Sequence, residues 1–233
     1  MKKLITRRQA IVAGLASIGG VALSRPNELP PTYGSLLRMG DNFTYLAHRL
    51  LLPQNALVKE YTERDITAFP AIGTTNAHVD VAQWKLSVEG LVAKPQTFTM
   101  AELKRLPART QITRHTCEEG WSAIAQWTGV PLSTILDAAG ILPAARYVKS
   151  HSYDDYENSI DLLDAFHPQT ILAYAMNGRD LPVQHGAPLR LRVERQLGYK
   201  GLKYLTRLIV TSEFDDGGQK GDLANGWAWY TGI

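Results

Sequence analysis

Residues 114–132, RHTCEEGWSAIAQWTGVPL, contain Cys117, the only cysteine in this chain of 233 residues. A single cysteine cannot form an internal disulfide, and one thiol cannot complete a structural zinc site. Three roles are open to it: an inert buried side chain, a nucleophile, or one ligand of a metal whose other ligands come from elsewhere. Lone cysteines are most often small buried apolar residues, but Arg114 and His115 could lower the thiol pKa and favour the thiolate.

The sequence around this stretch predicts short strands mixed with short helices. Residues 109–117 have a strand pattern that ends at Cys117, before the turn sequence EEGW. Pro131 and Gly140 bracket a predicted helix, and a Thr-x-x-Glu capping box predicts a short helix after Thr99. Further strand patterns lie at residues 84–92, 146–153, 171–183, 188–195 and 204–214. Many strands without regular strand–helix alternation predict an α+β fold with mixed β-sheets and short helices.

A second segment, HGAPLRLRVERQLGYKGLKYL at 185–205, gathers basic residues beside glycines. Its basic side chains after the histidine are Arg190, Arg192, Arg195, Lys200 and Lys203. Strand alternation predicts Arg190 and Arg192 on one face. Arginine and lysine near accessible backbone N–H groups suit a phosphorylated ligand, whereas a solvated basic strand face is the alternative. Neither a Walker A loop nor a GxGxxG turn is present.

The first 24 residues, MKKLITRRQAIVAGLASIGGVALS, have the organisation of an export signal. A basic start is followed by an uncharged stretch at 10–23, shorter than the ~20 apolar residues of a membrane-spanning helix. Consecutive Arg7 and Arg8 favour a twin-arginine signal, with an ordinary secretory signal or an uncleaved anchor as alternatives. The sequence therefore predicts a periplasmic protein. Any association with the membrane is expected to come through a partner.

The charge balance gives no argument for nucleic-acid binding. The leader contributes four of the 25 basic residues and no acidic residue, so 21 basic residues face 22 acidic ones in the rest of the chain. The basic pI belongs mainly to the leader, and the electrostatic term that dominates nucleic-acid binding is missing.

Residues 25–64 are predicted to form a linker and an amphipathic helix. The linker starts as RPNELPPTYG, and Pro53 ends the helical pattern. The apolar positions, spaced by three and four, are Leu36, Met39, Phe43, Leu46 and Leu50. We expect this face to pack on the domain; docking to a membrane or a membrane subunit is the alternative. Residues 65–233 are predicted to form the main domain.

Three separated segments resemble the molybdopterin-binding domain of the sulfite oxidase family. They are residues 114–132, residues 167–193 (HPQTILAYAMNGRDLPVQHGAPLRLRV) and residues 196–210 (QLGYKGLKYLTRLIV). They occur in the family's order, and the resemblance covers roughly residues 65–233. The chain is similar to the family's small exported bacterial members, such as the catalytic subunit of the periplasmic methionine sulfoxide reductase.

The resemblance implies the sulfite-oxidase fold and a molybdenum-molybdopterin cofactor with a single pterin. It also implies that Cys117 supplies the protein thiolate to molybdenum and is the catalytic metal ligand. One cysteine suffices in such a site because the pterin brings two sulfurs and oxo or hydroxo groups complete the shell. A soft thiolate suits this redox metal.

The resemblance also implies contacts to the pterin and its phosphate. Ser152 stands where the family has a threonine, His185 stands where the reductase has an asparagine, and Phe69 lies near the N-terminal pterin contact. The remaining expected contacts are Arg190, the GxK residues Gly201, Leu202 and Lys203, and the adjacent Lys200. His185 and Phe69 depart from the reductase's pattern, so the substrate is left open.

The implied activity is two-electron oxygen-atom transfer on a small substrate, in the direction of a sulfoxide-type reductase. The sequence has no CxxCH haem motif, so we expect electrons to be exchanged with a separate haem protein, either a membrane haem subunit or a cytochrome. The short segment after the last strand leads us to expect a monomeric catalytic subunit without the family's dimerisation domain.

Two alternative functions remain open, one with the opposite direction of reaction and one in another class of protein. One is sulfite dehydrogenase-type oxidation; the other is a non-catalytic periplasmic binding protein on the same fold, which would have no need of Cys117. Candidates for the substrate pocket are Arg114, His115, Trp121 and Tyr156. An acidic loop with Asp154, Asp155 and Glu157 is a candidate partner contact, with a solvated loop as the alternative.

Overall fold

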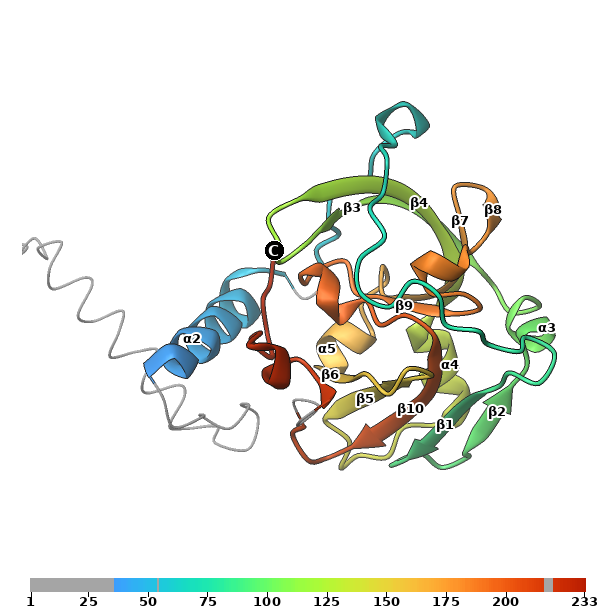
Figure 1. Ribbon diagram of the computed structural model, residues 1–233. Helices are drawn as coiled ribbons and strands as arrows, with labels where there is room; N and C mark the ends of the chain where they lie inside the picture. Colours follow the sequence, from blue (N-terminus) through green and yellow to red (C-terminus); the bar gives the residue numbers. More distant parts are fainter. Residues whose placement is uncertain (1–35, 54, 216–219) are drawn as a thin grey trace, which may run out of the picture.

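The structure, a computed structural model, describes residues 36–53, 55–215 and 220–233 (Figure 1). The predicted export signal and most of the predicted linker lie outside the described residues. No helix in the described part of the chain is long and apolar enough to span a membrane.

Two five-stranded sheets form the body of the molecule (Figure 1). The first has the order β3 (Arg109–Thr116), β4 (Ser122–Pro131), β7 (Ile171–Met176) and β8 (Arg179–Asp180), with β9 (Arg190–Arg192) also paired to β7. The second has the order β2 (Gln96–Phe98), β1 (Leu86–Gly90), β10 (Leu205–Thr211), β5 (Tyr147–Ser152) and β6 (Glu157–Asp161). Strands β1 and β10 are parallel and the other pairs are antiparallel.

The helices are short, apart from the first one described. The α-helices are α2 (Leu36–Leu51), α3 (Met100–Leu103), α4 (Leu132–Ala139) and α5 (Leu162–Ala165). The 3-10 helices are η1 (Glu63–Asp65), η2 (Val183–His185), η3 (Gly198–Lys200) and η5 (Leu223–Asn225). The predicted capping box opens α3, where the Thr99 side chain accepts from the Glu102 N–H. Gly140 ends α4 with a φ of 69°, a left-handed conformation that favours glycine.

The main core lies between the sheets and includes α4. Leu172 and Val130 from the first sheet and Leu86 and Val148 from the second belong to one buried cluster with Ile135 of α4. This cluster is apolar throughout. A functional site with polar side chains is therefore expected at the ends of the strands and in the loops that connect them.

Helix α2 packs on the domain through polar and aromatic side chains. Arg49 donates to Asp161 and Asp164, and the Tyr45 hydroxyl donates to Asp161 over 2.8 Å. Phe43 and Leu50 are 49% and 55% exposed, so the expectation that the apolar face packs inward is wrong for these two residues. A charged side chain that is removed from water needs an ion-pair partner. For Arg49 the partners are Asp164 of α5 and Asp161 at the N-cap of α5.

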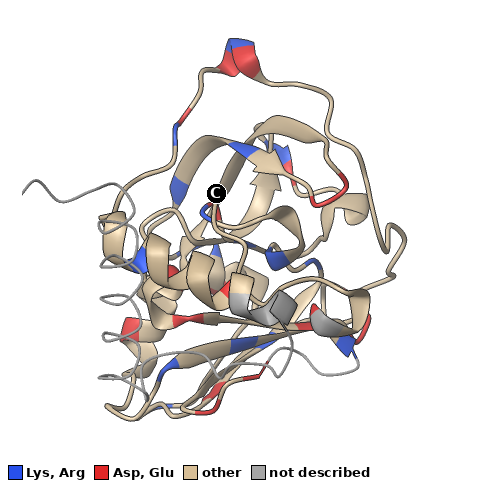
Figure 2. Cartoon of the chain, turned by 90° about the vertical axis from the view of Figure 1, so that its left-hand side faces the viewer, with Lys and Arg blue, Asp and Glu red and all other residues tan. Residues whose placement is uncertain are grey.

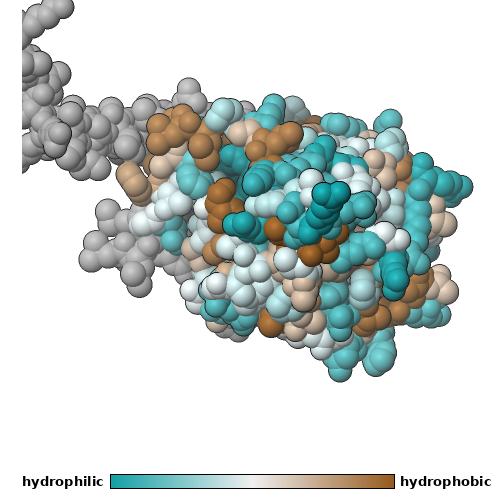
Figure 3. Space-filling view, turned by 90° about the horizontal axis from the view of Figure 1, so that it is seen from above, coloured by the Kyte–Doolittle hydropathy of each residue, from teal (hydrophilic) through white to brown (hydrophobic). Residues whose placement is uncertain are grey.

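Charge and hydropathy are both dispersed over the described surface. Figure 2 shows basic and acidic residues interspersed along the fold. Figure 3 shows separate apolar patches on the upper face, some at the end of the molecule where α2 lies. The exposed large apolar residues of α2 and the turn after it include Phe43, Leu50, Leu51 and Leu52.

Candidate functional site

Cys117 lies in the turn that joins β3 to β4. The Cys117 N–H donates to the Trp121 carbonyl over 2.9 Å, and the Gly120 N–H donates to the Cys117 carbonyl over 3.1 Å. Gly120 has a φ of 90°, a conformation that a residue with a Cβ adopts only under strain. The tight turn therefore fixes the thiol at the end of a strand.

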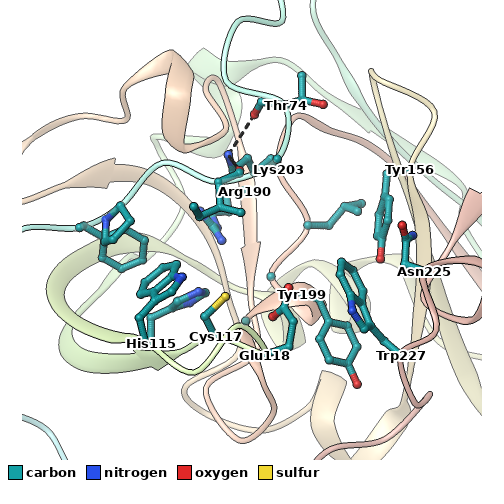
Figure 4. Close-up of a pocket in the computed structure, with 18 of the residues that line it drawn as sticks. Thr74, His115, Cys117, Glu118, Tyr156, Arg190, Tyr199, Lys203, Asn225 and Trp227 are labelled. Atoms are coloured by element: carbon teal, nitrogen blue, oxygen red, sulfur yellow. Dashed lines mark hydrogen bonds between the residues drawn. The ribbon is translucent and has the colours of Figure 1, made fainter.

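A cavity of about 290 Å³ opens beside this thiol (Figure 4). Its wall combines the β3–β4 turn, the segment before β1, the region from β9 to β10 and the C-terminal segment. The residues that line it include Phe69, Thr74, His115, Cys117, Glu118, Trp121, Asp154, Tyr156, Arg190, Gly198, Tyr199, Gly201, Leu202, Lys203, Asn225 and Trp227. Segments far apart in the sequence thus converge on one cysteine.

The burial alternation of β3 decides which of its residues reach the cavity. His115 and Cys117 are buried, whereas Arg114, which directly precedes His115, is exposed, and its guanidinium lies 5.5 Å from the Tyr61 ring centroid. His115 and Trp121 line the cavity, as expected, and their rings lie 5.4 Å apart. Arg114 points away from the cavity, because alternate side chains of a strand face opposite sides.

His115 is a neutral side chain with a fixed tautomer. Its Nδ1 accepts from Arg192 Nη1 over 2.7 Å, so its proton resides on Nε2. Burial, followed by the charges of Arg192 and Arg190, lowers the pKa of His115 far below its usual range. A Cβ at Gly198 would lie 2.2 Å from His115 Nε2, so the glycine leaves room for this ring.

The Cys117 thiol is protonated when no metal is bound. Burial raises its pKa to about 11, and the neighbouring Glu118 and Glu119 carboxylates add to the shift. The expectation that Arg114 and His115 lower this pKa is wrong, because Arg114 faces away and His115 carries no charge. A thiol with such a pKa is a poor nucleophile at neutral pH, whereas a metal can displace its proton.

Arg190 is a buried cation whose hydrogen bonds are incomplete. It is 4% exposed, its Nη1 donates to the His185 carbonyl over 3.2 Å, and its Nε has no partner. Burial and the Arg192 charge lower the pKa of Arg190 to about 9. Arg192, by contrast, makes two contacts of 2.9 and 2.8 Å to Glu194. Of these two arginines, Arg190 is the one that lines the cavity, and no carboxylate in the described part of the chain forms an ion pair with it.

Lys203 adds a second cation on the same side of the cavity (Figure 4). Its Nζ donates to the carbonyls of Ile72, Thr74 and Gln184 over 2.5, 2.9 and 2.8 Å. Carbonyls stabilise the ammonium but carry no net charge. Burial and the charge of Arg190 lower the pKa of Lys203 to about 8, so an anion bound here would stabilise both cations.

The structure brings most of the expected cofactor residues into this wall. Those that line the cavity are Phe69, Cys117, Arg190, Gly201, Leu202 and Lys203. His185 lies directly behind the wall: its ring packs edge-on against Phe69, with centroids 5.4 Å apart, and its Nδ1 is buried without a partner. Burial and Arg190 lower the pKa of His185 to about 4. Ser152 is buried beside the cavity and donates to the lining residue Asp154.

Lys200 does not face the cavity, contrary to the expected phosphate contact. It is fully buried, and its Nζ donates to the Asp222 carboxylate and, over 3.0 Å, to the Ser159 carbonyl. The charge of Lys200 is thus neutralised inside the protein, and a second anion would have to break this pair. Of the acidic loop, Asp154 lines the cavity, Asp155 contacts Lys220 over 3.6 Å and Glu157 contacts Lys149 over 2.8 Å.

Several lining residues escaped the sequence analysis. Glu118, with a buried unpartnered Oε2, follows Cys117 directly and could have been inferred from its place in the turn. Gly198 lies in the basic, glycine-containing segment at 185–205, but nothing in that segment indicates that it faces His115. Tyr199, Asn225 and Trp227 carry no motif, and only the three-dimensional fold brings them to the cavity.

The residues present fit a phosphorylated metal cofactor. A thiol offers a soft ligand, and the unpartnered Nε of Arg190 offers a buried donor to an anion. A Cβ at Gly201 would lie 3.2 Å from the Gly198 and Leu191 carbonyls and 3.3 Å from Arg190 Nη2. The glycine therefore keeps a backbone cradle open beside this guanidinium.

The cavity combines the Cys117 thiol with the Arg190 and Lys203 cations. This combination is typical of proteins that bind an anionic metal cofactor. The protein-family model described as "Oxidoreductase molybdopterin binding domain" matches residues 72–218 of the chain. The chain therefore belongs to this family of molybdopterin-binding oxidoreductases. It is 37% identical over 240 residues to the putative protein-methionine-sulfoxide reductase subunit YedZ1 of Azospira oryzae, an alignment that covers 99% of this chain and 87% of the relative.

A solved structure is similar in fold. The sulfane dehydrogenase SoxCD from Paracoccus pantotrophus matches with a TM-score of 0.56 and 24% sequence identity. The match covers 69% of this chain, which spans about half, 46%, of that structure's chain. The predicted family, the α+β sulfite-oxidase fold and the assignment as a molybdopterin-dependent oxidoreductase are confirmed.

Proposed function

We propose that this chain is the catalytic subunit of an exported sulfoxide-type reductase that holds molybdenum with a single pterin. The observation that carries the proposal is the convergence of the Cys117 thiol, the unpaired Arg190 guanidinium and the Lys203 ammonium on one cavity. The cofactor, when bound, supplies the centre at which an oxygen atom is transferred and two electrons are exchanged. The net reaction combines a sulfoxide, two protons and two electrons to give a thioether and water.

The chain's own residues would hold the cofactor by its two ends. Cys117 would ligate the metal, and Arg190 and Lys203 would neutralise the pterin phosphate beside the backbone of Gly201 and Leu202. Phe69 would pack along the pterin, His185 would support the Phe69 ring from behind, and Ser152 would act from behind Asp154. Lys200 has no direct contact in this proposal, because Asp222 already pairs with it.

The remaining cavity favours a neutral substrate over an anionic one. Glu118 lines it together with the rings of Trp121 and Trp227. Carboxylates repel sulfite, whereas apolar rings accommodate a sulfoxide and make favourable contacts with sulfur. The reductive direction is therefore preferred to sulfite oxidation.

Electrons would come from a separate haem protein, either a membrane subunit or a cytochrome. The chain carries no CxxCH motif, and the relative from Azospira oryzae is itself named as a subunit. Residues 1–24 would direct export to the periplasm by the twin-arginine route. The main domain, residues 65–233, would act as a monomeric catalytic unit, with residues 25–64 leading into it.

The test begins with protein purified from the envelope of a host that makes the cofactor. Molybdenum would be measured by mass spectrometry and pterin by the fluorescence of its oxidised derivative. We expect stoichiometric metal and pterin, and reduction of sulfoxides by a reduced viologen dye. Oxidation of sulfite without reduction of any sulfoxide would assign the opposite direction. Folded protein without metal or pterin would identify a non-catalytic binding protein.

A further inference from the structure

One wall of the cavity comes from the C-terminal segment, beyond the part of the chain that matches the family. The family model ends at residue 218, yet Asn225 and Trp227 line the cavity. Figure 4 shows both on the side of Cys117 opposite His115, next to Tyr156 and Tyr199. This wall is therefore formed in part by residues outside the span that the family model matches.

The tail contributes an aromatic surface. The Trp227 ring lies 5.0 Å from the Tyr199 ring at an interplanar angle of 30°, and 6.5 Å from the Tyr156 ring. Trp227 is half-buried, so part of its ring packs on the protein and part borders the open cavity. Flat rings with little conformational freedom bind apolar substituents at a low entropic cost.

A buried ion pair fixes this wall. Asp222 and Lys200 are both fully buried and contact one another, and the second carboxylate oxygen of Asp222 accepts from the Tyr156 hydroxyl over 2.9 Å. The Asp222 carbonyl accepts from the Trp227 N–H over 3.0 Å. One carboxylate thus joins the η3 turn, the β6 side of the cavity and the tail.

The end of the tail is held independently. Trp229 Nε1 donates to the Ser159 hydroxyl over 2.9 Å, and the Tyr199 hydroxyl donates to the Ala228 carbonyl over 2.5 Å. The Ile233 N–H donates to the Arg195 carbonyl over 3.0 Å. Anchors on both sides of Trp227 leave its ring little freedom to leave the wall.

We propose that the tail is the specificity wall of the site: Trp227 and Asn225 contact the substituent of the sulfoxide, and Asp222 positions them through Lys200 and Tyr156. The substrate class named here rests on the proposed function. Arg190 and Lys203 lie away from this wall in Figure 4, so the wall borders the part of the cavity left for a neutral molecule. Trp227 and Asn225 are the contact residues, and Asp222 and Lys200 are positioning residues.

The contact is tested with two sulfoxides of different size, dimethyl sulfoxide and methyl p-tolyl sulfoxide. In Trp227→Ala, we expect the ratio of kcat/KM for the aryl over the dimethyl substrate to fall about tenfold, mainly through KM, because the aryl group loses its apolar contact. Trp227→Phe, which keeps a ring, should give a smaller fall. The matched control is Tyr153→Ala, which removes an exposed aromatic side chain outside the cavity wall.

Two results would overturn the contact. A substrate ratio in Trp227→Ala equal to that of the wild type would show that the ring does not touch the substituent. Loss of pterin in this variant would assign the wall to the cofactor instead. Wild-type protein that holds molybdenum and pterin but reduces neither sulfoxide would refute the proposed function. The positioning role of Asp222 and Lys200 would still be tested by the rate of trypsin cleavage after Lys220.

The positioning role has a readout independent of turnover. In Lys200→Met, Asp222 loses its buried cation and is expected to hold the tail less firmly, so that trypsin cleaves after the exposed Lys220 about tenfold faster than in the wild type. Lys200→Met with Asp222→Leu removes both charges and should return the cleavage rate toward the wild-type value. If Lys200→Met does not fold, Asp222→Asn gives a milder break. Equal cleavage rates in all these proteins would refute the ion pair as the anchor of the wall.

Discussion

Replacing Arg190 by methionine should stabilise the protein without its cofactor and weaken its hold on the cofactor. The reduction of the Arg190 pKa from 12.5 to about 9 by burial and Arg192 corresponds to a penalty of roughly 5 kcal/mol for the charged form. Because both values lie above neutral pH, the side chain stays charged and the penalty is fully present at pH 7. Relaxation, and the loss of the hydrogen bond to the His185 carbonyl, reduce the expected gain in Arg190→Met to about 2 kcal/mol.

The matched control is the neighbouring arginine on the same strand. Arg192 pairs with Glu194, whose side chain is fully buried, so Arg192→Met leaves an uncompensated buried carboxylate and should cost about 3–5 kcal/mol. For a chain of this size, we expect the Tm of cofactor-free protein to rise by about 5 °C in Arg190→Met and to fall by about 10 °C in Arg192→Met.

The assay is thermal unfolding of both variants purified from a host that cannot make molybdopterin. The same variants, made in a cofactor-competent host, would be analysed for pterin and molybdenum, and Arg190→Met should retain much less of each. A cofactor-free Arg190→Met protein that unfolds below the wild type, with normal pterin content in the competent host, would refute the assignment of Arg190 to an anion.

Three further predictions follow from single contacts. Cys117→Ser should lose molybdenum while its free energy of unfolding changes by no more than about 1 kcal/mol, as measured by metal analysis and denaturant unfolding; retained metal would contradict the ligand role. Gly198→Ala should lower the free energy of unfolding by at least about 2 kcal/mol, because the new Cβ meets the His115 ring. The control Gly40→Ala in α2, where nothing lies within 4 Å of the new Cβ, should raise it by up to about 1 kcal/mol. Equal effects of the two substitutions would show that the close approach of Gly198 to His115 does not limit stability. Lowering the pH from 7 to 5 should lower the Tm, because burial depresses the pKa of His185 to about 4 and the unfolded chain takes up a proton below about pH 6.5; His185→Gln should reduce this dependence, and an unchanged slope would refute it.

The sequence was sufficient where a short period or a local rule decides the structure. Alternation along residues 109–117 correctly predicts a strand that delivers Cys117 to its end, and the capping box at Thr99 is formed. Arg192 pairs with Glu194, which lies only two residues further along the chain, so this partner was within reach of a local rule. The family resemblance then gave the fold, because its three motifs surround the parts of the chain that form the cavity.

The sequence was insufficient where a partner distant along the chain decides the role of a side chain. Lys200 and Lys203 lie in one glycine-rich turn, yet Lys200 pairs with Asp222, 22 residues away, and Lys203 reaches the carbonyls before β1. In α2, the spacing of apolar residues predicted the buried face, but Arg49 and its partners Asp161 and Asp164 orient the helix differently. No local pattern contains these partners.

The arrangement of charge around the cavity links the two halves of the proposed reaction. Arg190 is buried and Lys203 half-buried, and neither forms an ion pair with a carboxylate among the described residues, so an anion that binds beside them would stabilise their charged forms. The opposite side presents Trp227 and Tyr156, with Glu118 near the thiol, and this side attracts no anion. Under the proposed function, Arg190 and Lys203 would therefore hold the charged end of the cofactor, and Cys117 would hold its metal end. Under the proposed function, a neutral sulfoxide would bind the remaining aromatic side, away from the cations that would hold the cofactor.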